Sequence, residues 1–123
     1  MMDGIVLVSH SSKIAQGLSD LLSQVARDVP ITLAGGTADG GIGTDFEKIS
    51  EAVAQNPADR ILAFFDLGSA RMNLDMAADF SGKELRIYQV PLIEGAYAAA
   101  ALLEAGVKLE KIEKQLKELE ITK

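Results

Sequence analysis

Four short apolar runs, separated by segments of helical periodicity, constrain the fold of this chain more than any other feature. The runs are Ile5–Val8, Ile31–Ala34, Ile61–Phe65 and Leu85–Val90. The first is continuous and rich in β-branched residues, which is typical of a parallel strand covered on both faces. Strands that alternate with helices form right-handed βαβ units. The sequence therefore predicts an α/β fold with a single doubly wound, mainly parallel sheet and helices on both faces.

The segments between the runs carry the start signals of helices. Ser11 or Ser12 is suited to cap a first helix, and Thr44 and Glu47 form a capping-box pair before a second. The turn 66–70 leads into a third helix, for which it supplies a suitable N-cap. Apolar residues expected along that third helix are Met72, Leu74, Met76, Ala77 and Phe80.

The last part of the chain predicts two further helices. Residues 94–105 are rich in alanine, whose small side chains permit close packing. The charged segment after them carries one apolar seam, formed by Leu109, Ile112, Leu116 and Leu119. This pattern predicts an amphipathic C-terminal helix that packs on the domain or on a second subunit.

Composition limits the classes of protein to consider. A chain of 123 residues that is 48% hydrophobic is long enough for one domain, spanning residues 1–123. Its formal charge of -6, with scattered basic residues, disfavours nucleic acid as a partner. The absence of cysteine excludes disulfides, a thiolate nucleophile and a cysteine zinc site. No apolar run approaches about 20 residues and no leader pattern is present, so we expect a cytoplasmic protein without a membrane partner.

Three chemically suggestive features follow three of the predicted strands. The single histidine, His10, follows the first strand, the glycine-rich stretch 35–43 follows the second, and Asp66 follows the third. In open parallel sheets, sites form at the carboxyl ends of the strands, where the strand order reverses. We therefore expect these three features to meet at one edge of the sheet.

His10 has several possible roles. In the simplest interpretation, His10 is a surface residue of a loop and has no further role. A metal site is disfavoured because a first coordination shell needs further His or Cys ligands, and a serine hydrolase is disfavoured because no G-x-S-x-G turn is present. The remaining interpretation is a nucleophile, since neutral imidazole can take a phosphoryl group. Backbone N–H groups at the start of the first helix, around Ser11 to Ile14, would stabilise the added negative charge.

Asp66 and the glycine-rich stretch each have two interpretations. Asp66 is either an orienting carboxylate for the His10 ring or a cap of the following turn. The glycine-rich stretch lacks both the position of a dinucleotide fingerprint and the lysine of a P-loop. It is therefore a flexible connection or a loop that contacts a transferred phosphate or a protein partner.

Three motifs together resemble the mannose-type IIA family of the bacterial phosphotransferase system. They are IVLVSHSSKIAQGL at the start, GGTADGGIGTD after the second strand and FFDLGSARMN after the third. Within that family the chain is most similar to the phosphotransferase subunits of dihydroxyacetone kinase. The likeness covers nearly the whole chain, and the order and spacing of the motifs make it specific.

The resemblance implies a phosphoryl relay in which His10 accepts phosphate from the phosphocarrier HPr and Asp66 holds the imidazole. The acceptor would be ADP on the nucleotide-binding subunit of dihydroxyacetone kinase, so this chain would itself hold no cofactor and no metal. Contacts to the phosphate or the partner are expected from Ser11, Gly36, Thr37 and Ser69. Because two proteins must share one phosphate, His10 is expected to be exposed, and the family implies a homodimer.

Two other functions stay open. One is a IIA component of a mannose-type sugar transporter, which would pass phosphate to a IIB domain. The short turn DLGSA, residues 66–70, favours the kinase subunit over that alternative. The other is a noncatalytic interaction module of the same fold, with the C-terminal amphipathic helix as its main functional surface.

Overall fold

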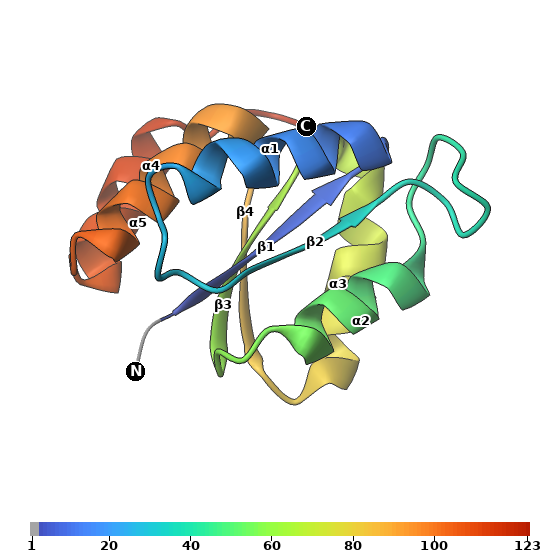
Figure 1. The fold of residues 1–123 in the computed structure, drawn as a ribbon, viewed down its shortest axis with the longest axis horizontal. Helices are drawn as coiled ribbons and strands as arrows, with labels where there is room; N and C mark the ends of the chain where they lie inside the picture. The colour runs from blue at the N-terminus through green and yellow to red at the C-terminus, as the bar shows by residue number, and fades with distance from the viewer. Residues whose placement is uncertain (1–2) are drawn as a thin grey trace.

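The computed structural model describes residues 3–123 and contains one parallel sheet of four strands. The strands, in the spatial order β2-β1-β3-β4, are β2 (Ile31–Gly35), β1 (Gly4–Ser9), β3 (Arg60–Phe65) and β4 (Glu84–Tyr88). The helices are α1 (Ser12–Ser23), α2 (Phe46–Gln55), the 3-10 helix η1 (Gly68–Ala70), α3 (Arg71–Ser81), α4 (Leu92–Glu104) and α5 (Leu109–Glu118). Figure 1 shows the sheet between two helical layers, α1, α4 and α5 on one face and α2 and α3 on the other. The predicted doubly wound α/β fold with a C-terminal helix is confirmed.

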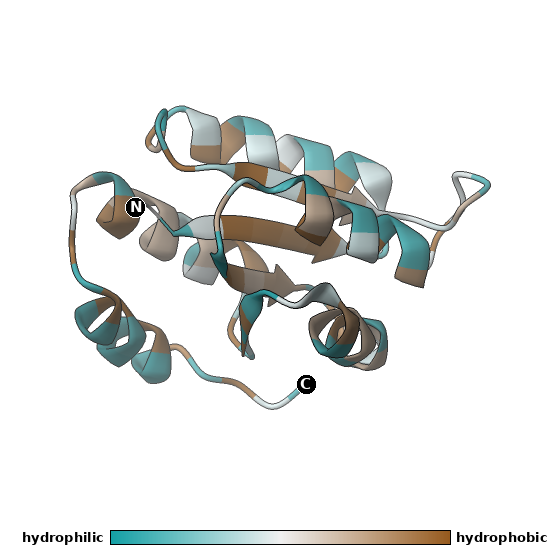
Figure 2. Cartoon of the chain, turned by 90° about the horizontal axis from the view of Figure 1, so that it is seen from below, coloured by the Kyte–Doolittle hydropathy of each residue, from teal (hydrophilic) through white to brown (hydrophobic). Residues whose placement is uncertain are grey.

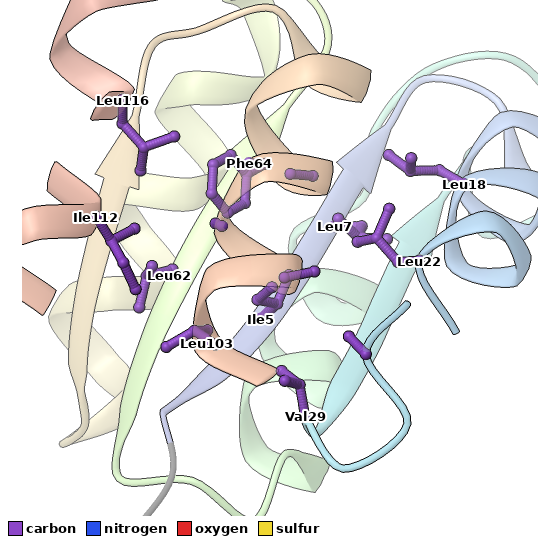
Figure 3. Close-up of a cluster of buried hydrophobic side chains, with 14 of the residues drawn as sticks. Ile5, Leu7, Leu18, Leu22, Val29, Leu62, Phe64, Leu103, Ile112 and Leu116 are labelled. Atoms are coloured by element: carbon purple, nitrogen blue, oxygen red, sulfur yellow. The ribbon is translucent and has the colours of Figure 1, made fainter. Parts of the chain in front are cut away.

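The side chains of the two central strands alternate between two separate cores. In β1, Ile5 and Leu7 face the layer of α1, α4 and α5, whereas Val6 and Val8 face α2 and α3. Figure 3 shows strand residues of the first core, with Phe64 near its centre, packed against helix residues including Leu18, Leu103 and Ile112. Figure 2 shows the same pattern, with apolar strands inside and polar outer faces on the helices. Burial of the central strands on both faces accounts for their continuous apolar sequence.

A buried polar side chain closes the end of the sheet opposite the carboxyl ends of its strands. Asn56 is fully buried and follows α2. Its side-chain amide donates to the backbone carbonyls of Ile5 at 3.1 Å and Pro30 at 3.2 Å. Its Oδ1 accepts from the backbone N–H of Ala58 at 3.1 Å. Asn56 thereby satisfies buried backbone groups at this end of the sheet.

Two sequence-based predictions of helix starts differ from the structure. The N-cap of α2 is Asp45, whose carboxylate accepts from the N–H of Lys48 at 2.9 Å, and the predicted capping residue Thr44 instead accepts a side-chain hydrogen bond from Asn73. Thr and Asp are both good N-cap residues, so the spacing in the sequence did not show which of these two neighbours caps α2. The turn 66–70 contains the helix η1, and no side chain of the turn caps α3.

Some of the apolar residues predicted for α3 are exposed, whereas the seam of α5 packs on the domain, which is one of the two positions expected for it. Met72, Met76 and Phe80 are exposed on α3, and the buried residues of that helix are Leu74 and Ala77. The seam of α5 is buried on this chain's own domain, chiefly through Ile112 and Leu116. The fourth strand ends at Tyr88, before the predicted end at Val90. None of the helices within residues 3–123 has the length and apolar character needed to cross a bilayer.

Candidate active site

The pairing of β1 with β3 brings His10 and Asp66 together. Val8 lies opposite Phe65 in the register of these parallel strands, so the residues that follow them leave the sheet at the same edge. The ring Nδ1 of His10 and Oδ1 of Asp66 are 2.8 Å apart. Strand order thus places a carboxylate next to the imidazole, across a large separation in sequence.

Asp66 is held by four hydrogen bonds, three from Ser9 and His10 and one from Leu67. Its Oδ2 accepts from the backbone N–H of His10 at 2.9 Å and from the hydroxyl of Ser9 at 2.8 Å. Its Oδ1 accepts from the backbone N–H of Leu67 at 2.7 Å in addition to the imidazole. Burial alone would raise the pKa of Asp66, but the hydrogen bonds from His10, Ser9 and Leu67 outweigh burial and lower that pKa below its ordinary value. Asp66 is therefore a carboxylate at neutral pH.

The hydrogen-bond partners of the ring determine the tautomer of His10. A carboxylate only accepts, so Nδ1 carries the proton and donates to Asp66. In the neutral ring, Nε2 then carries the lone pair. The hydroxyl of Ser69, in η1, lies 2.7 Å from Nε2 and donates to it. Nε2 is therefore the ring nitrogen that faces Ser69 and the surface.

The imidazole is less exposed than the sequence led us to expect. The side chain of His10 retains 16% of its accessible surface and that of Asp66 retains 17%. The expectation of an exposed His10 needs correction, because contacts with Asp66 and Ser69 cover much of the ring. The Nε2–Ser69 side remains at the surface. Nε2 therefore faces the surface, whereas Nδ1 is covered by Asp66.

The start of α1 offers fewer free N–H groups than expected. Ser11 is the N-cap, and its hydroxyl accepts from the N–H of Ile14 at 3.4 Å. The N–H of Ser11 itself donates to the hydroxyl of Ser9 at 3.1 Å. Within residues 3–123, the N–H groups of Ser11 and Ile14 therefore already have hydrogen-bond partners. Ser12 and Lys13 are the residues whose N–H groups lack intrahelical partners at this helix end.

The glycine-rich stretch is tied to the site through its backbone. The N–H of Gly36 donates to the carbonyl of Ser9, and the N–H of Gly43 donates to the carbonyl of His10 at 2.9 Å. Gly36 has a φ of +75°, a left-handed conformation that favours glycine. The hydroxyl of Thr37 is engaged within the loop, where it accepts from the N–H of Gly41 at 2.9 Å. The loop projects beyond the sheet (Figures 1 and 2), and the hydrogen bonds to Ser9 and His10 hold its base at the site.

Of the six residues singled out from the sequence, three have interacting side chains: His10, Asp66 and Ser69. Ser11, Gly36 and Thr37 lie on the segments around them without a hydrogen bond to the imidazole.

Two further residues at the site were not identified from the sequence. Ser9 is a buried partner of Asp66, and its place at the end of a strand was a usable signal. Lys123, whose ammonium contacts the carbonyl of Phe65, carries no local sequence signal.

Metal ligands are not grouped in the described part of the chain. Within residues 3–123, no three side chains of the ligand types His, Asp and Glu lie close enough together to hold one ion. The groups that the site presents are an imidazole, a carboxylate, two serine hydroxyls and backbone N–H groups. This set suits nucleophilic attack by Nε2 and binding of an anion next to it.

Known proteins resemble this chain over its whole length. Residues 4–113 match the family described as PTS system fructose IIA component. A phosphotransferase subunit of PTS-dependent dihydroxyacetone kinase, DhaM, from Lactococcus lactis is 53% identical over 123 residues, which are all of both chains. A phosphoryl donor subunit of PEP-dependent dihydroxyacetone kinase 1 from Listeria innocua is 46% identical over 96% of this chain and 95% of its own length. The corresponding subunit of Escherichia coli is 32% identical over 90% of this chain, which spans 25% of that longer relative.

Solved structures agree with this relationship. The crystal structure of a protein of unknown function has a TM-score of 0.85 and 32% identity, covering 99% of this chain and 98% of the other. A sigma-54 interaction domain protein from Enterococcus faecalis has a TM-score of 0.71 over 95% of this chain, but at 14% identity it shows a shared fold alone. The family match over residues 4–113 and the full-length relatives show that this chain belongs to the IIA component family of the phosphotransferase system.

Proposed function

We propose that this chain is a phosphohistidine carrier: His10 accepts a phosphoryl group from phospho-HPr and passes it to ADP on the nucleotide-binding subunit of a dihydroxyacetone kinase. The observation that carries the proposal is the contact of Nδ1 with Asp66 at 2.8 Å, which leaves Nε2 as the nucleophile at the surface. The names of the full-length relatives, phosphotransferase or phosphoryl donor subunits, support the same role. In this role the chain carries the group, and ADP or ATP is bound by its partner.

The loading step follows from the tautomer of His10. The lone pair of Nε2 attacks the phosphorus of the donor, and the P–N bond of the donor breaks with its electron pair returning to the donor imidazole. The proton on Nδ1 of His10 stays in place, so the phosphorylated ring carries a positive charge beside Asp66. The carboxylate stabilises that charge and holds the ring in the orientation for in-line attack.

The unloading step reverses the same geometry with a different acceptor. An oxygen of the terminal phosphate of ADP attacks the phosphorus, and the electron pair of the P–N bond returns to Nε2. Ser69, whose hydroxyl lies 2.7 Å from Nε2, is placed to donate to an oxygen of the transferred group in both steps. The N–H groups of Ser12 and Lys13 at the start of α1 are further donors for that group.

A transporter role is the alternative, with a IIB domain as acceptor. The full-length relatives are named as kinase subunits, which does not favour it. The experiment is to load the chain with phospho-HPr, purify it and mix it with each candidate acceptor. We expect ATP to form on the ADP-bound kinase subunit and phosphate to stay on this chain when a IIB domain is offered.

We also propose a homodimer, as the family resemblance implies. The alanines at 96, 99 and 100 of α4, and Ile112 and Leu116 of α5, are buried in this chain's own core. Apolar side chains that remain available include Met72, Met76 and Phe80 on α3. Light scattering of the purified chain, with Met72→Ser and Met76→Ser as variants, tests whether the dimer forms and whether α3 contributes to it.

A further inference from the structure

We propose that Lys123 is a positioning residue for the phosphoryl transfer at His10: its ammonium, fixed beside the residue that precedes Asp66, offsets the negative charge of the Asp66 carboxylate. The inference rests on the proposed carrier function and adds a residue to it. The supporting observations are the contacts of the Lys123 side chain, the path of the segment that carries it, and the charge of the site.

The ammonium of Lys123 is held by Phe65, the last residue of β3. Nζ donates to the backbone carbonyl of Phe65 and also lies 4.1 Å from the centre of the Phe65 ring. A cation over an aromatic face is attracted by the ring, and the carbonyl fixes its direction. Lys123 is only partly exposed. The end of a strand that leads directly into Asp66 therefore carries a fixed positive charge.

The segment after α5 brings Lys123 to this place. The N–H of Ile121 donates to the carbonyl of Gln89, and the side-chain amide of Gln89 donates back to the carbonyl of Ile121 at 3.0 Å. The backbone of Lys123 then lies against Gly68, where an added Cβ would be 2.9 Å from the carbonyl carbon of Lys123. Glycine at that position permits the close approach. The segment thus crosses from α5 past the end of β4 to the loop between Asp66 and Ser69.

Charge explains what Lys123 contributes there. Asp66 is ionised, and the phosphoryl group adds further negative charge next to it, in a chain that already has a formal charge of -6. Two other cations have partners of their own: Arg71 pairs with Asp75 at 3.0 Å, and Lys48 donates to the carbonyl of Gly35 at 3.1 Å. Burial lowers the pKa of Lys123, but its attraction to the Asp66 carboxylate opposes that effect and favours the ammonium. The same attraction stabilises the ionised form of Asp66.

The test compares Lys123→Gln with Lys123→Arg and with a matched control, Lys114→Gln, which removes the same charge from an exposed position on α5. Single-turnover loading from phospho-HPr is followed by rapid quenching over a range of donor concentrations. We expect Lys123→Gln to lower the maximal loading rate about tenfold without changing the half-saturating donor concentration. Lys123→Arg and Lys114→Gln should load at the rate of the unmodified chain.

A second readout does not depend on activity. The carboxyl 13C signal of Asp66 is followed during an acid titration of each folded variant. We expect Lys123→Gln to raise the midpoint of Asp66, while Lys123→Arg and Lys114→Gln leave it unchanged. Gln89→Ala, which removes one anchor of the segment, should shift the midpoint in the same direction by less.

The outcomes separate this inference from the proposed function. If the unmodified chain is loaded and Lys123→Gln has the same rate and the same Asp66 midpoint, Lys123 has no positioning role. A change in the half-saturating concentration alone would mean that Lys123 contacts the donor, which also overturns the inference. If the unmodified chain is not loaded, the proposed function fails and the positioning role fails with it, while the titration still shows whether Lys123 acts on Asp66.

Discussion

His10 and Asp66 are separated by 56 residues in sequence, yet one carboxylate binds both the ring and the backbone of the same histidine. Oδ1 of Asp66 is 2.8 Å from the ring Nδ1, and Oδ2 is 2.9 Å from the backbone nitrogen. Two contacts from one rigid group remove the freedom of the ring to turn relative to its own backbone. The orientation of Nε2 is therefore set by the pairing of β1 with β3, and not only by the loop that carries His10.

Replacing Asp66 should slow phosphoryl transfer strongly. In Asp66→Ala the ring loses both its orienting partner and the charge that stabilises the phosphorylated imidazolium. We expect single-turnover loading to fall by roughly 10²-fold or more, the scale of a lost acid-base or orienting group. Asp75→Ala, which removes an exposed carboxylate paired with Arg71, is the matched control and should leave the rate unchanged. Equal rates for the two variants would remove Asp66 from the mechanism.

Asp66 should also make the stability of the fold depend on acid pH. Hydrogen bonds lower the pKa of Asp66 in the folded chain, whereas an unfolded Asp titrates near about 3.9. The contribution of its charge to stability is therefore complete above about pH 4 and is lost as the pH falls through the lower folded value. Urea unfolding at several pH values should show a difference in unfolding free energy between the unmodified chain and Asp66→Asn at about pH 5. That difference should shrink at lower pH, and a difference that grows there would contradict the prediction.

Ser69 should affect transfer without affecting the fold. Its hydroxyl contacts Nε2 at the surface, so Ser69→Ala removes one hydrogen bond and leaves no buried group unsatisfied. We expect a loading rate about tenfold lower and a change in unfolding free energy below about 1 kcal/mol. Chemical denaturation measured beside the transfer assay checks both values. A large loss of stability would mean that Ser69 is structural.

Asn56 should affect the fold without affecting the chemistry. Asn56→Ala removes a hydrogen-bond partner from the buried carbonyl of Ile5 and from the N–H of Ala58, at the end of the sheet opposite the carboxyl ends of its strands. We expect the unfolding free energy to fall by about 2 to 4 kcal/mol, from two buried groups left unsatisfied. Where this variant is still folded, its loading rate should equal that of the unmodified chain. A slowed loading step in the folded variant would show that the two ends of the sheet are coupled.

The fold was predictable because its strands are buried on both faces. Continuous apolar runs such as Ile61–Phe65 are typical of strands covered by helices on each side, and their alternation with helical segments indicates the parallel α/β class. The orientation of individual helices was not predictable in the same way. Met72, Met76 and Phe80 have helical spacing, but so do Leu74 and Ala77, and in the structure only the second set is buried.

The site was predictable to the extent that it follows strand ends. His10 and Asp66 each come after a buried strand, and the fold brings those ends together. The remaining contacts depend on loops whose path has no periodic signal. Ser69 was associated with the site through the family resemblance alone, and Lys123 reaches Phe65 from the far end of the chain. Long-range contacts of this kind have no local signature in sequence.

The most direct test of the account is the mass of the intact chain after incubation with enzyme I, HPr and phosphoenolpyruvate. We expect a gain of one phosphoryl group that is lost in acid and that fragmentation places on His10. His10→Gln lacks the imidazole, and once circular dichroism has shown that it is folded, it should gain nothing. An unmodified chain that gains no phosphoryl group, or a His10→Gln variant that gains one with the same acid lability, would contradict the claim that His10 carries the phosphate.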